Sequence, residues 1–260
     1  MADSVPSIRV VRKLAFLVSL VCLAALTDAE RVRASVARAR PLLILWAWER
    51  PESLRFLKSQ QAEIAFLAES IYLDRQPRLR PRMQPLSVSQ GTPLIAVVRL
   101  EVTPETPREF DIAYTNEVSS WIANAAMLPQ VRAMQIDYDA PRSQRGFYRA
   151  LLEQVRARLP QSMPLSITAL GSWCVGDDWL RGLPIDEAVP MLFRMGVDRP
   201  NIMHALAAGD DFREPLCRTS VGVSTDEPWP EIAPGRRVYL FNPRRWTETS
   251  FETVQRKLTP

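Results

Sequence analysis

The segment Ala133-Met134-Gln135-Ile136-Asp137-Tyr138-Asp139-Ala140 joins a short apolar run to polar side chains at alternating positions. If the segment is a β-strand, Gln135, Asp137 and Asp139 point to the same face of the sheet. In a β/α barrel, the functional groups stand at the carboxyl ends of the strands and on the loops that follow them. A strand that carries two carboxylates to its carboxyl end therefore favours a barrel with its chemistry at that end.

Apolar runs of this kind recur eight times along the chain, and each ends in a polar or aromatic cluster. They are continuous more than alternating, as strands buried on both faces are. Helical patterns lie between them, at residues 110–128 and 144–159, and a closing helix at 247–258 follows, which Thr247 or Thr249 could cap. The predicted strands are residues 42–46, 64–68, 94–100, 133–136, 165–170, 188–193, 219–223 and 238–241.

The alternation of strands and helices predicts an α/β fold, a single (β/α)8 TIM-like barrel over residues 41–260. The second unit is expected to be irregular, because residues 74–90 are rich in Pro and Arg. Within it, residues 83–88 can form an extra strand or hairpin instead of a helix. An open doubly wound sheet is the alternative architecture, but no glycine-rich phosphate loop follows the first strand.

Composition is typical of one folded domain that does not bind nucleic acid. The chain has 260 residues, and 47% of them are hydrophobic, which is enough for a full core. The net charge of +4 comes from 33 basic and 29 acidic residues mixed along the chain, without a basic stripe interleaved with aromatics. His204 is the single histidine, so a His-based triad or a zinc site has no support, and we expect no metal or cofactor.

The N-terminus has the order of a secretory signal peptide. Basic residues precede the apolar run 14–26, and Thr27-Asp28-Ala29 suits a signal peptidase. We expect cleavage near Ala29, then a basic linker over residues 30–40, and a periplasmic or secreted domain. The alternative is an uncleaved inner-membrane anchor through residues 14–26, because the arginines just downstream make translocation harder.

Cys174 and Cys217 remain once that segment is removed, so one disulfide is possible in an oxidising compartment. Cys174 follows the fifth predicted strand, whereas Cys217 precedes the seventh, which places the two at opposite ends of a barrel. That separation exceeds the Cα distance that a disulfide tolerates. The sequence therefore predicts two free, buried thiols.

Asp137 and Asp139 are the leading catalytic candidates. Carboxylates this close raise the pKa of one of them, so that one can act as a general acid while the other stays ionised. The alternative role is structural, because either Asp could cap the following helix or pair with Arg142 or Arg145.

Aromatic and acidic side chains stand at the other predicted strand ends. Indole rings stack on sugar faces, although barrel cores also use Trp routinely. An acid at these places more often forms a salt bridge or a cap than a catalytic group. The candidates for a second catalytic carboxylate are Glu49, Glu69, Asp226 and Glu227, with Glu49 taken as catalytic. The candidates for substrate binding are Trp46, Trp48, Glu69, Arg99, Gln135, Tyr138, Trp173, Asp226 and Glu227.

Three motifs resemble a known family. Residues 45–50 read Leu-Trp-Ala-Trp-Glu-Arg, residues 135–140 read Gln-Ile-Asp-Tyr-Asp-Ala, and residues 165–170 read Leu-Ser-Ile-Thr-Ala-Leu, with Trp173 beyond them. Together they look like a bacterial family catalogued as a domain of unknown function, over roughly residues 41–243. The resemblance implies an exported, glycosidase-like barrel and supports architecture more than reaction.

A more distant resemblance is to chitinase-type barrels, whose fourth strand carries alternating acids and ends in a catalytic Glu. It places Gln135 at the first acid, Asp137 at the inner Asp and Asp139 at the catalytic Glu. Asp139 is one methylene shorter than Glu, and Gln135 lacks the charge that tunes its neighbour. These departures argue against the chitinase mechanism in its usual form.

The resulting hypothesis is an exported barrel that binds a polysaccharide or oligosaccharide across its C-terminal face and cleaves it with strand-end carboxylates. A non-catalytic carbohydrate-binding barrel is the first alternative. A membrane-anchored scaffold protein, held by residues 14–26, is the second.

Overall fold

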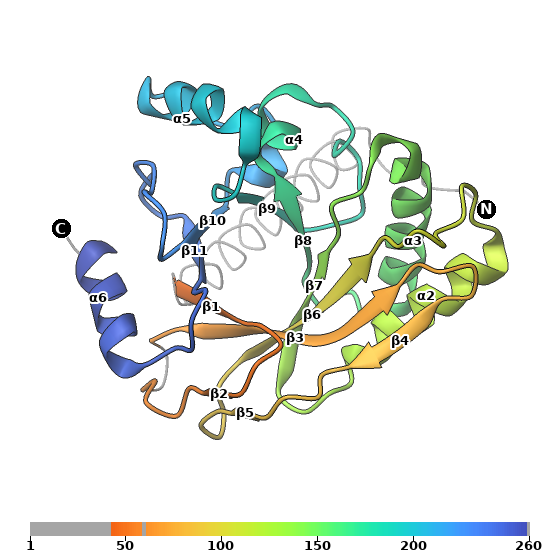
Figure 1. Ribbon diagram of the computed structural model, residues 1–260, viewed down its shortest axis with the longest axis horizontal. Helices are drawn as coiled ribbons and strands as arrows, with labels where there is room; N and C mark the ends of the chain where they lie inside the picture. Colours follow the sequence, from red (N-terminus) through yellow and green to blue (C-terminus); the bar gives the residue numbers. More distant parts are fainter. Residues whose placement is uncertain (1–42, 59–60, 259–260) are drawn as a thin grey trace, which may run out of the picture. The chain divides into compact units, whose positions relative to one another are not determined.

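The computed structural model describes residues 43–58 and 61–258, which form a closed barrel of parallel strands with helices outside it (Figure 1). The strand order is β1-β11-β10-β9-β8-β7-β6-β3, and pairing between β1 and β3 closes the ring. Each predicted apolar run overlaps one of these strands, so the expected TIM-like barrel is confirmed. The strands are β1 (Leu43–Ala47), β3 (Glu63–Tyr72), β6 (Leu94–Glu101), β7 (Val131–Asp137), β8 (Leu165–Leu170), β9 (Glu187–Met191), β10 (Ser220–Ser224) and β11 (Arg237–Phe241).

Helices follow β6, β7, β8, β9 and β11. Among them, α2 and α3 lie side by side against the barrel (Figure 1). The expected cap of the closing helix is Thr247, whose Oγ1 accepts a hydrogen bond from the backbone N–H of Ser250 at 3.1 Å. The helices are α2 (Ile112–Ala125), α3 (Arg145–Arg158), α4 (Gly171–Gly176), α5 (Arg199–Ala207) and α6 (Glu248–Leu258).

Among the described residues, no helix follows β1, β3 or β10, and the connection after β3 forms strands instead. After β3 the chain forms β4 (Arg78–Pro81), which runs antiparallel to the second half of β3. It then forms β5 (Leu86–Ser87), which pairs with β2 (Glu52–Ser53). The expected irregularity is confirmed, and residues 83–88 contribute a strand.

Arg82 fastens this irregular connection to the barrel. Its guanidinium donates hydrogen bonds to the carbonyl oxygens of Trp48 and Arg50, both at 2.7 Å. A third bond reaches the carbonyl oxygen of Ala47 at 3.1 Å. One side chain therefore satisfies several backbone acceptors where β1 ends, which fixes the chain at that point.

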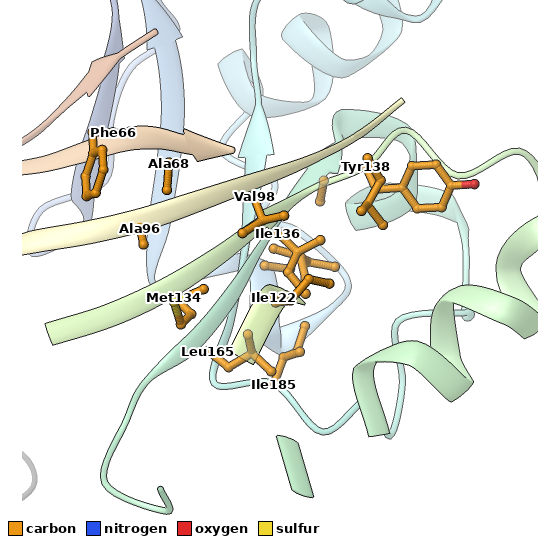
Figure 2. Close-up of a cluster of buried hydrophobic side chains, with 14 of the residues drawn as sticks. Phe66, Ala68, Ala96, Val98, Ile122, Met134, Ile136, Tyr138, Leu165 and Ile185 are labelled. Carbon is orange, nitrogen blue, oxygen red and sulfur yellow. The ribbon is translucent and has the colours of Figure 1, made fainter. Parts of the chain in front are cut away.

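Two layers of apolar side chains stabilise the barrel. The outer layer fills the space between strands and helices, and Figure 2 shows part of it, including Val98, Ile136 and Ile122. The inner layer fills the barrel itself, because successive residues of a strand point to opposite faces. Its members are Ile44, Trp46, Ala65, Ile95, Val97, Val189, Tyr239 and Phe241.

The prediction of two free thiols is wrong, because Cys174 and Cys217 form a disulfide with a Cα–Cα distance of 5.9 Å. Cys174 lies in α4, beyond the end of β8, and Cys217 ends a short 3-10 helix, η3 (Pro215–Cys217), before β10. The two segments meet, and the backbone N–H of Glu214 donates to the carbonyl oxygen of Cys174 at 3.2 Å. Positions along the strands were a poor guide, since both cysteines lie in connections outside the strands.

The segments predicted as signal peptide or anchor, residues 1–29, and as basic linker, residues 30–40, lie outside the described residues. Across residues 43–58 and 61–258, no helix combines the length and the apolar character needed to cross a bilayer. The same part of the chain contains no group of three or more His, Cys, Asp or Glu side chains placed to hold a metal ion.

Candidate functional site

A hollow of about 280 Å³ opens at the carboxyl ends of the strands, and we call it the central hollow. Residues at or just beyond the ends of β1, β6, β7, β8, β9 and β11 contribute to it. It therefore occupies the end of the barrel where β/α barrels carry their sites. Its lining residues are Trp46, Trp48, Arg99, Asp137, Asp139, Thr168, Leu170, Gly171, Ser172, Met191, Phe193, Arg194, Met195, Asp198, Ile202 and Phe241.

The two acids at the end of β7 face this hollow together. Asp137 is the last residue of β7 and is buried, whereas Asp139 lies two residues further on and is exposed. The hydroxyl of Thr168, on neighbouring β8, donates a hydrogen bond to Oδ1 of Asp137 at 2.6 Å. The alternating positions thus deliver both carboxylates to one cavity, at two different depths.

Arg99 of β6 stands beside this pair. Its Nε lies 2.8 Å from Oε1 of Glu101 and 3.8 Å from Oδ2 of Asp137. The guanidinium is therefore engaged mainly by Glu101, and it neutralises Asp137 only in part. Arg99 also lies over the indole of Trp48, with its Cζ 6.0 Å from the ring centre.

Burial raises the pKa of Asp137, while the hydrogen bond from Thr168 and the charge of Arg99 oppose that rise. The pKa of Asp139 is also raised, first by desolvation against the walls of the hollow and then by the negative charge of Asp137. Two carboxylates that interact in this way release their protons in steps that belong to the pair. Such a pair can retain a proton that an isolated Asp would lose, and can deliver it as a general acid.

Aromatic rings form the walls and floor of the central hollow. Phe193 and Phe241 are stacked, with ring centroids 5.5 Å apart and an interplanar angle of 4°. Trp48 meets Phe241 edge to face at 6.5 Å. Trp46 lies deeper, only 3% exposed, and its Nε1 donates to Oε1 of Gln135 at 2.8 Å. Flat apolar faces beside carboxylates suit a ring-shaped ligand that also carries hydroxyl groups.

The indole of Trp46 fits inside the barrel because β10 has a glycine opposite it. A Cβ at Gly222 would lie 2.8 Å from Cη2 of Trp46, closer than carbon atoms approach in proteins. Beneath the indole, the Gln135 side chain donates from Nε2 to the Oγ of Ser166 at 3.3 Å. Gln135 is fully buried and therefore supports the floor from below without lining the hollow.

Tyr138 and Trp173 point away from the central hollow. Tyr138 stands between the two acids in sequence, so strand alternation turns it into the outer layer (Figure 2). There its hydroxyl donates to Oε1 of Gln144. Trp173 is buried in α4, where its ring meets Trp179 edge to face at 4.8 Å. Neither ring is placed to stack on a ligand in the central hollow.

Glu69 also lies on the outer side of the barrel, because a β-bulge changes the alternation of β3. The register shifts between Leu67 and Glu69, after which Glu69 pairs with Val98, a residue of the outer layer. Burial raises the pKa of Glu69 to about 7, and its Oε1 has no hydrogen-bond partner within the described residues. Glu69 is therefore a buried acid on the opposite face of the sheet from the acid pair.

The other three predicted acids hold loops in place. Glu49 accepts hydrogen bonds at 3.0 and 3.2 Å from two backbone N–H groups that follow β4. Glu227 accepts the backbone N–H of Arg194 at 3.0 Å and forms an ion pair with Arg199 at 2.7 Å. Asp226 lies 3.9 Å from the Arg194 guanidinium. None of these three carboxylates lines the central hollow, although Arg194 does.

The central hollow contains residues that the sequence interpretation did not select. Thr168 could have been found, since Ser166 and Thr168 alternate within an otherwise apolar run. Phe193 and Phe241 carry no signal that separates them from core residues. Asp198, just before α5, brings a third carboxylate from another wall, and it is exposed. Its sequence context is that of an ordinary loop residue.

The fold and this site define a TIM-like barrel with an acid pair at its C-terminal mouth. A family model described as "Domain of unknown function (DUF3142)" matches residues 90–189 of the chain. The matched segment includes β6, β7 and β8, and so both acids of the pair. The expected resemblance to a family of unknown function is confirmed over this segment. A search of the curated proteins finds no match.

Solved structures of similar chain course include the following two. The spore cortex-lytic enzyme SleL of Bacillus cereus has a TM-score of 0.46 and 13% identity, with 72% of this chain and 51% of that chain covered. The chitinase domain of the spore coat protein CotE from Clostridium difficile has a TM-score of 0.40 and 11% identity, with 78% and 65% covered. This chain thus spans about half of the first and less than two thirds of the second.

Proposed function

We propose that the protein binds a polysaccharide or oligosaccharide in the central hollow and hydrolyses a glycosidic bond there. One observation carries the proposal: Asp137 and Asp139 share a cavity with aromatic walls at the carboxyl end of the barrel. Its volume of about 280 Å³ is near the lower end of the ~300–1,000 Å³ typical of ligand sites. Such a cavity suits one or a few sugar rings of a longer chain.

In this proposal Asp139 is the general acid. Its pKa is raised and its side chain is exposed at the mouth, where a glycosidic oxygen can approach it. Asp137, beside Arg99, stabilises the positive charge that develops on the sugar ring. Asp198 supplies a carboxylate from a different wall, as the activation of a water molecule requires.

The test compares Asp139→Asn with the unmodified protein on a panel of neutral and acidic glycans. We expect kcat to fall by about 100-fold or more, because general acid catalysis contributes at least that much. Asp210→Asn is the matched control, since Asp210 is exposed and does not line the hollow. Full activity of Asp139→Asn, with turnover measured as reducing ends, would contradict the assigned role.

A non-catalytic carbohydrate-binding barrel is the second candidate. Arg99 favours it, because its positive charge opposes the rise in the pKa of Asp139 and so opposes retention of the proton that the general acid must deliver. Binding without turnover across the same panel would identify this function. Binding is measured by the change in Trp fluorescence, to which Trp48 at the mouth contributes.

Export remains part of the proposal and rests on the N-terminal pattern of basic and apolar residues. The disulfide between Cys174 and Cys217 supports it, since such bonds persist mainly in oxidising compartments. Cell fractionation, with sequencing of the mature N-terminus, separates a cleaved periplasmic or secreted protein from one anchored in the inner membrane.

A further inference from the structure

A second hollow, of about 190 Å³, adjoins the central hollow. Trp48 and Arg99 line both cavities and form their common wall. The far side of the second hollow comes from β3 and β4, through Ser70, Tyr72 and Arg80. It lies where the connection after β3 forms β4 instead of a helix.

Strand pairing places polar groups of this hollow in one row with Asp137. Arg80 of β4 pairs with Ser70 of β3, and Ser70 pairs in turn with Arg99 of β6. Arg99 pairs with Asp137 of β7. Residues paired across neighbouring strands point to the same face of the sheet. Three strand spacings, roughly 14 Å, separate Arg80 from Asp137, so only a ligand longer than one sugar ring can reach both.

The charge of Arg80 is not paired with any group among the described residues. Arg80 is exposed, and its guanidinium has no ion pair or hydrogen bond within the described part of the chain. The two carboxylates of the second hollow are both engaged, Glu101 by Arg99 at 2.8 Å and Glu49 by backbone N–H groups. The second hollow therefore offers one uncommitted cation to whatever enters it.

We propose that the second hollow binds an acidic sugar unit of the ligand, with Arg80 pairing its carboxylate or sulfate group. The inference rests on the proposed carbohydrate binding. It adds that the glycan is an acidic one. A guanidinium matches a planar anion with two parallel N–H donors. The hydroxyls of Ser70 and Tyr72, which have no hydrogen bond among the described residues, supply further donors.

The experiment uses pairs of oligosaccharides that differ only in charge. They are tetragalacturonate and its methyl ester, cellotetraose with and without oxidation at C6, and a chondroitin tetrasaccharide with and without sulfate. Dissociation constants are measured by calorimetry for the unmodified protein and for Arg80→Ala. Arg132→Ala is the matched control, because Arg132 is exposed at the other end of β7. Circular dichroism verifies that each variant is folded.

We expect the acidic member of at least one pair to bind about tenfold more tightly than its neutral partner. The ratio should fall to near one in Arg80→Ala and persist in Arg132→Ala. The carboxylate and sulfate pairs separate the two sources of charge. Equal binding of acidic and neutral members, or a preference that survives Arg80→Ala, overturns this inference while glycan binding stands. If no oligosaccharide binds, the proposed function itself fails.

Discussion

The buried carboxylates at the two ends of the barrel differ in how many partners the protein gives them. At the amino-terminal end, Glu187 is 3% exposed and forms an ion pair with Arg237. Hydroxyls of Thr219 and Tyr239 donate to it at 3.0 and 3.1 Å. At the carboxyl end, Asp137 receives one hydroxyl hydrogen bond, and Nε of Arg99 lies 3.8 Å from its Oδ2.

The difference separates an end whose buried acid is satisfied by the protein from an end whose acids face a cavity. A buried acid with a cation and two hydroxyl donors is satisfied by the protein alone. The acid pair has raised pKa values and faces a cavity, so its carboxyl groups can still form hydrogen bonds with a molecule bound there. The same parallel strands thus carry a satisfied acid at one end of the barrel and a cavity with two acids at the other.

The largest expected effect on stability comes from removing the ion pair between Glu187 and Arg237 at the amino-terminal end. Glu187→Gln should lower the free energy of unfolding by about 3 kcal/mol, because it leaves the Arg237 guanidinium without its ion-pair partner. Asp137→Asn is the counterpart at the open end. It should not lower stability at pH 7, since the raised pKa means that the charged Asp137 is itself unfavourable there. Urea unfolding measures both, and equal losses would show that the two ends do not differ.

Filling the space beside Trp46 should have an intermediate effect. Gly222→Ala places a carbon 2.8 Å from the Trp46 ring, which should cost about 1–3 kcal/mol of stability and weaken ligand binding as the indole shifts. Gly146→Ala is the control, because its Cβ meets nothing within 4 Å and it lies in α3. Thermal unfolding and Trp fluorescence titration report the two effects. Unchanged ligand affinity in Gly222→Ala would mean that Trp46 does not shape the site.

The smallest expected effect concerns Glu69, a buried acid on the outer side of the barrel. Its pKa of about 7 in the folded protein exceeds the ordinary 4.5, so the folded state binds more protons than the unfolded chain between these values. Its contribution to stability is therefore present below about pH 4.5 and is lost as pH rises through 7. Glu69→Gln should be more stable than the parent at pH 8, by on the order of 1–2 kcal/mol, and similar at pH 4.

Urea unfolding at pH 4, 5.5 and 8 measures this difference. Other carboxyls, among them Asp137 and Asp139, also have shifted pKa values and change the stability of both proteins with pH, so only the difference between the two proteins belongs to Glu69. If the difference in stability between Glu69→Gln and the parent is the same at all three pH values, Glu69 does not ionise within this range.

Local patterns were sufficient to predict the strands and the acid pair. Continuous apolar runs located every barrel strand, since burial on both faces leaves that pattern in the sequence. The alternation of Gln135, Asp137 and Asp139 indicated a common face, and the two aspartates do meet in one cavity. The same alternation turns Tyr138 outward, so its selection as a ligand-binding residue went against the period of the strand.

Features that depend on distant segments could not be predicted in this way. The bulge before Glu69 changes which face that residue occupies, and no residue type marks it in the sequence. The disulfide forms because α4 and η3 meet outside the strands, whereas strand positions suggested opposite ends. The place of Asp198 depends on how the connection after β9 folds over the mouth, and that is a property of tertiary packing.

The strand β4 has a consequence for how barrels of this kind could acquire new preferences. All four of its residues are exposed, and among the described strands it pairs only with the second half of β3. Its side chains can therefore be exchanged at little cost to either apolar layer. Under the proposed function, substitutions in this short edge strand would change which ligands bind while leaving the acid pair, three strand spacings away, unaltered.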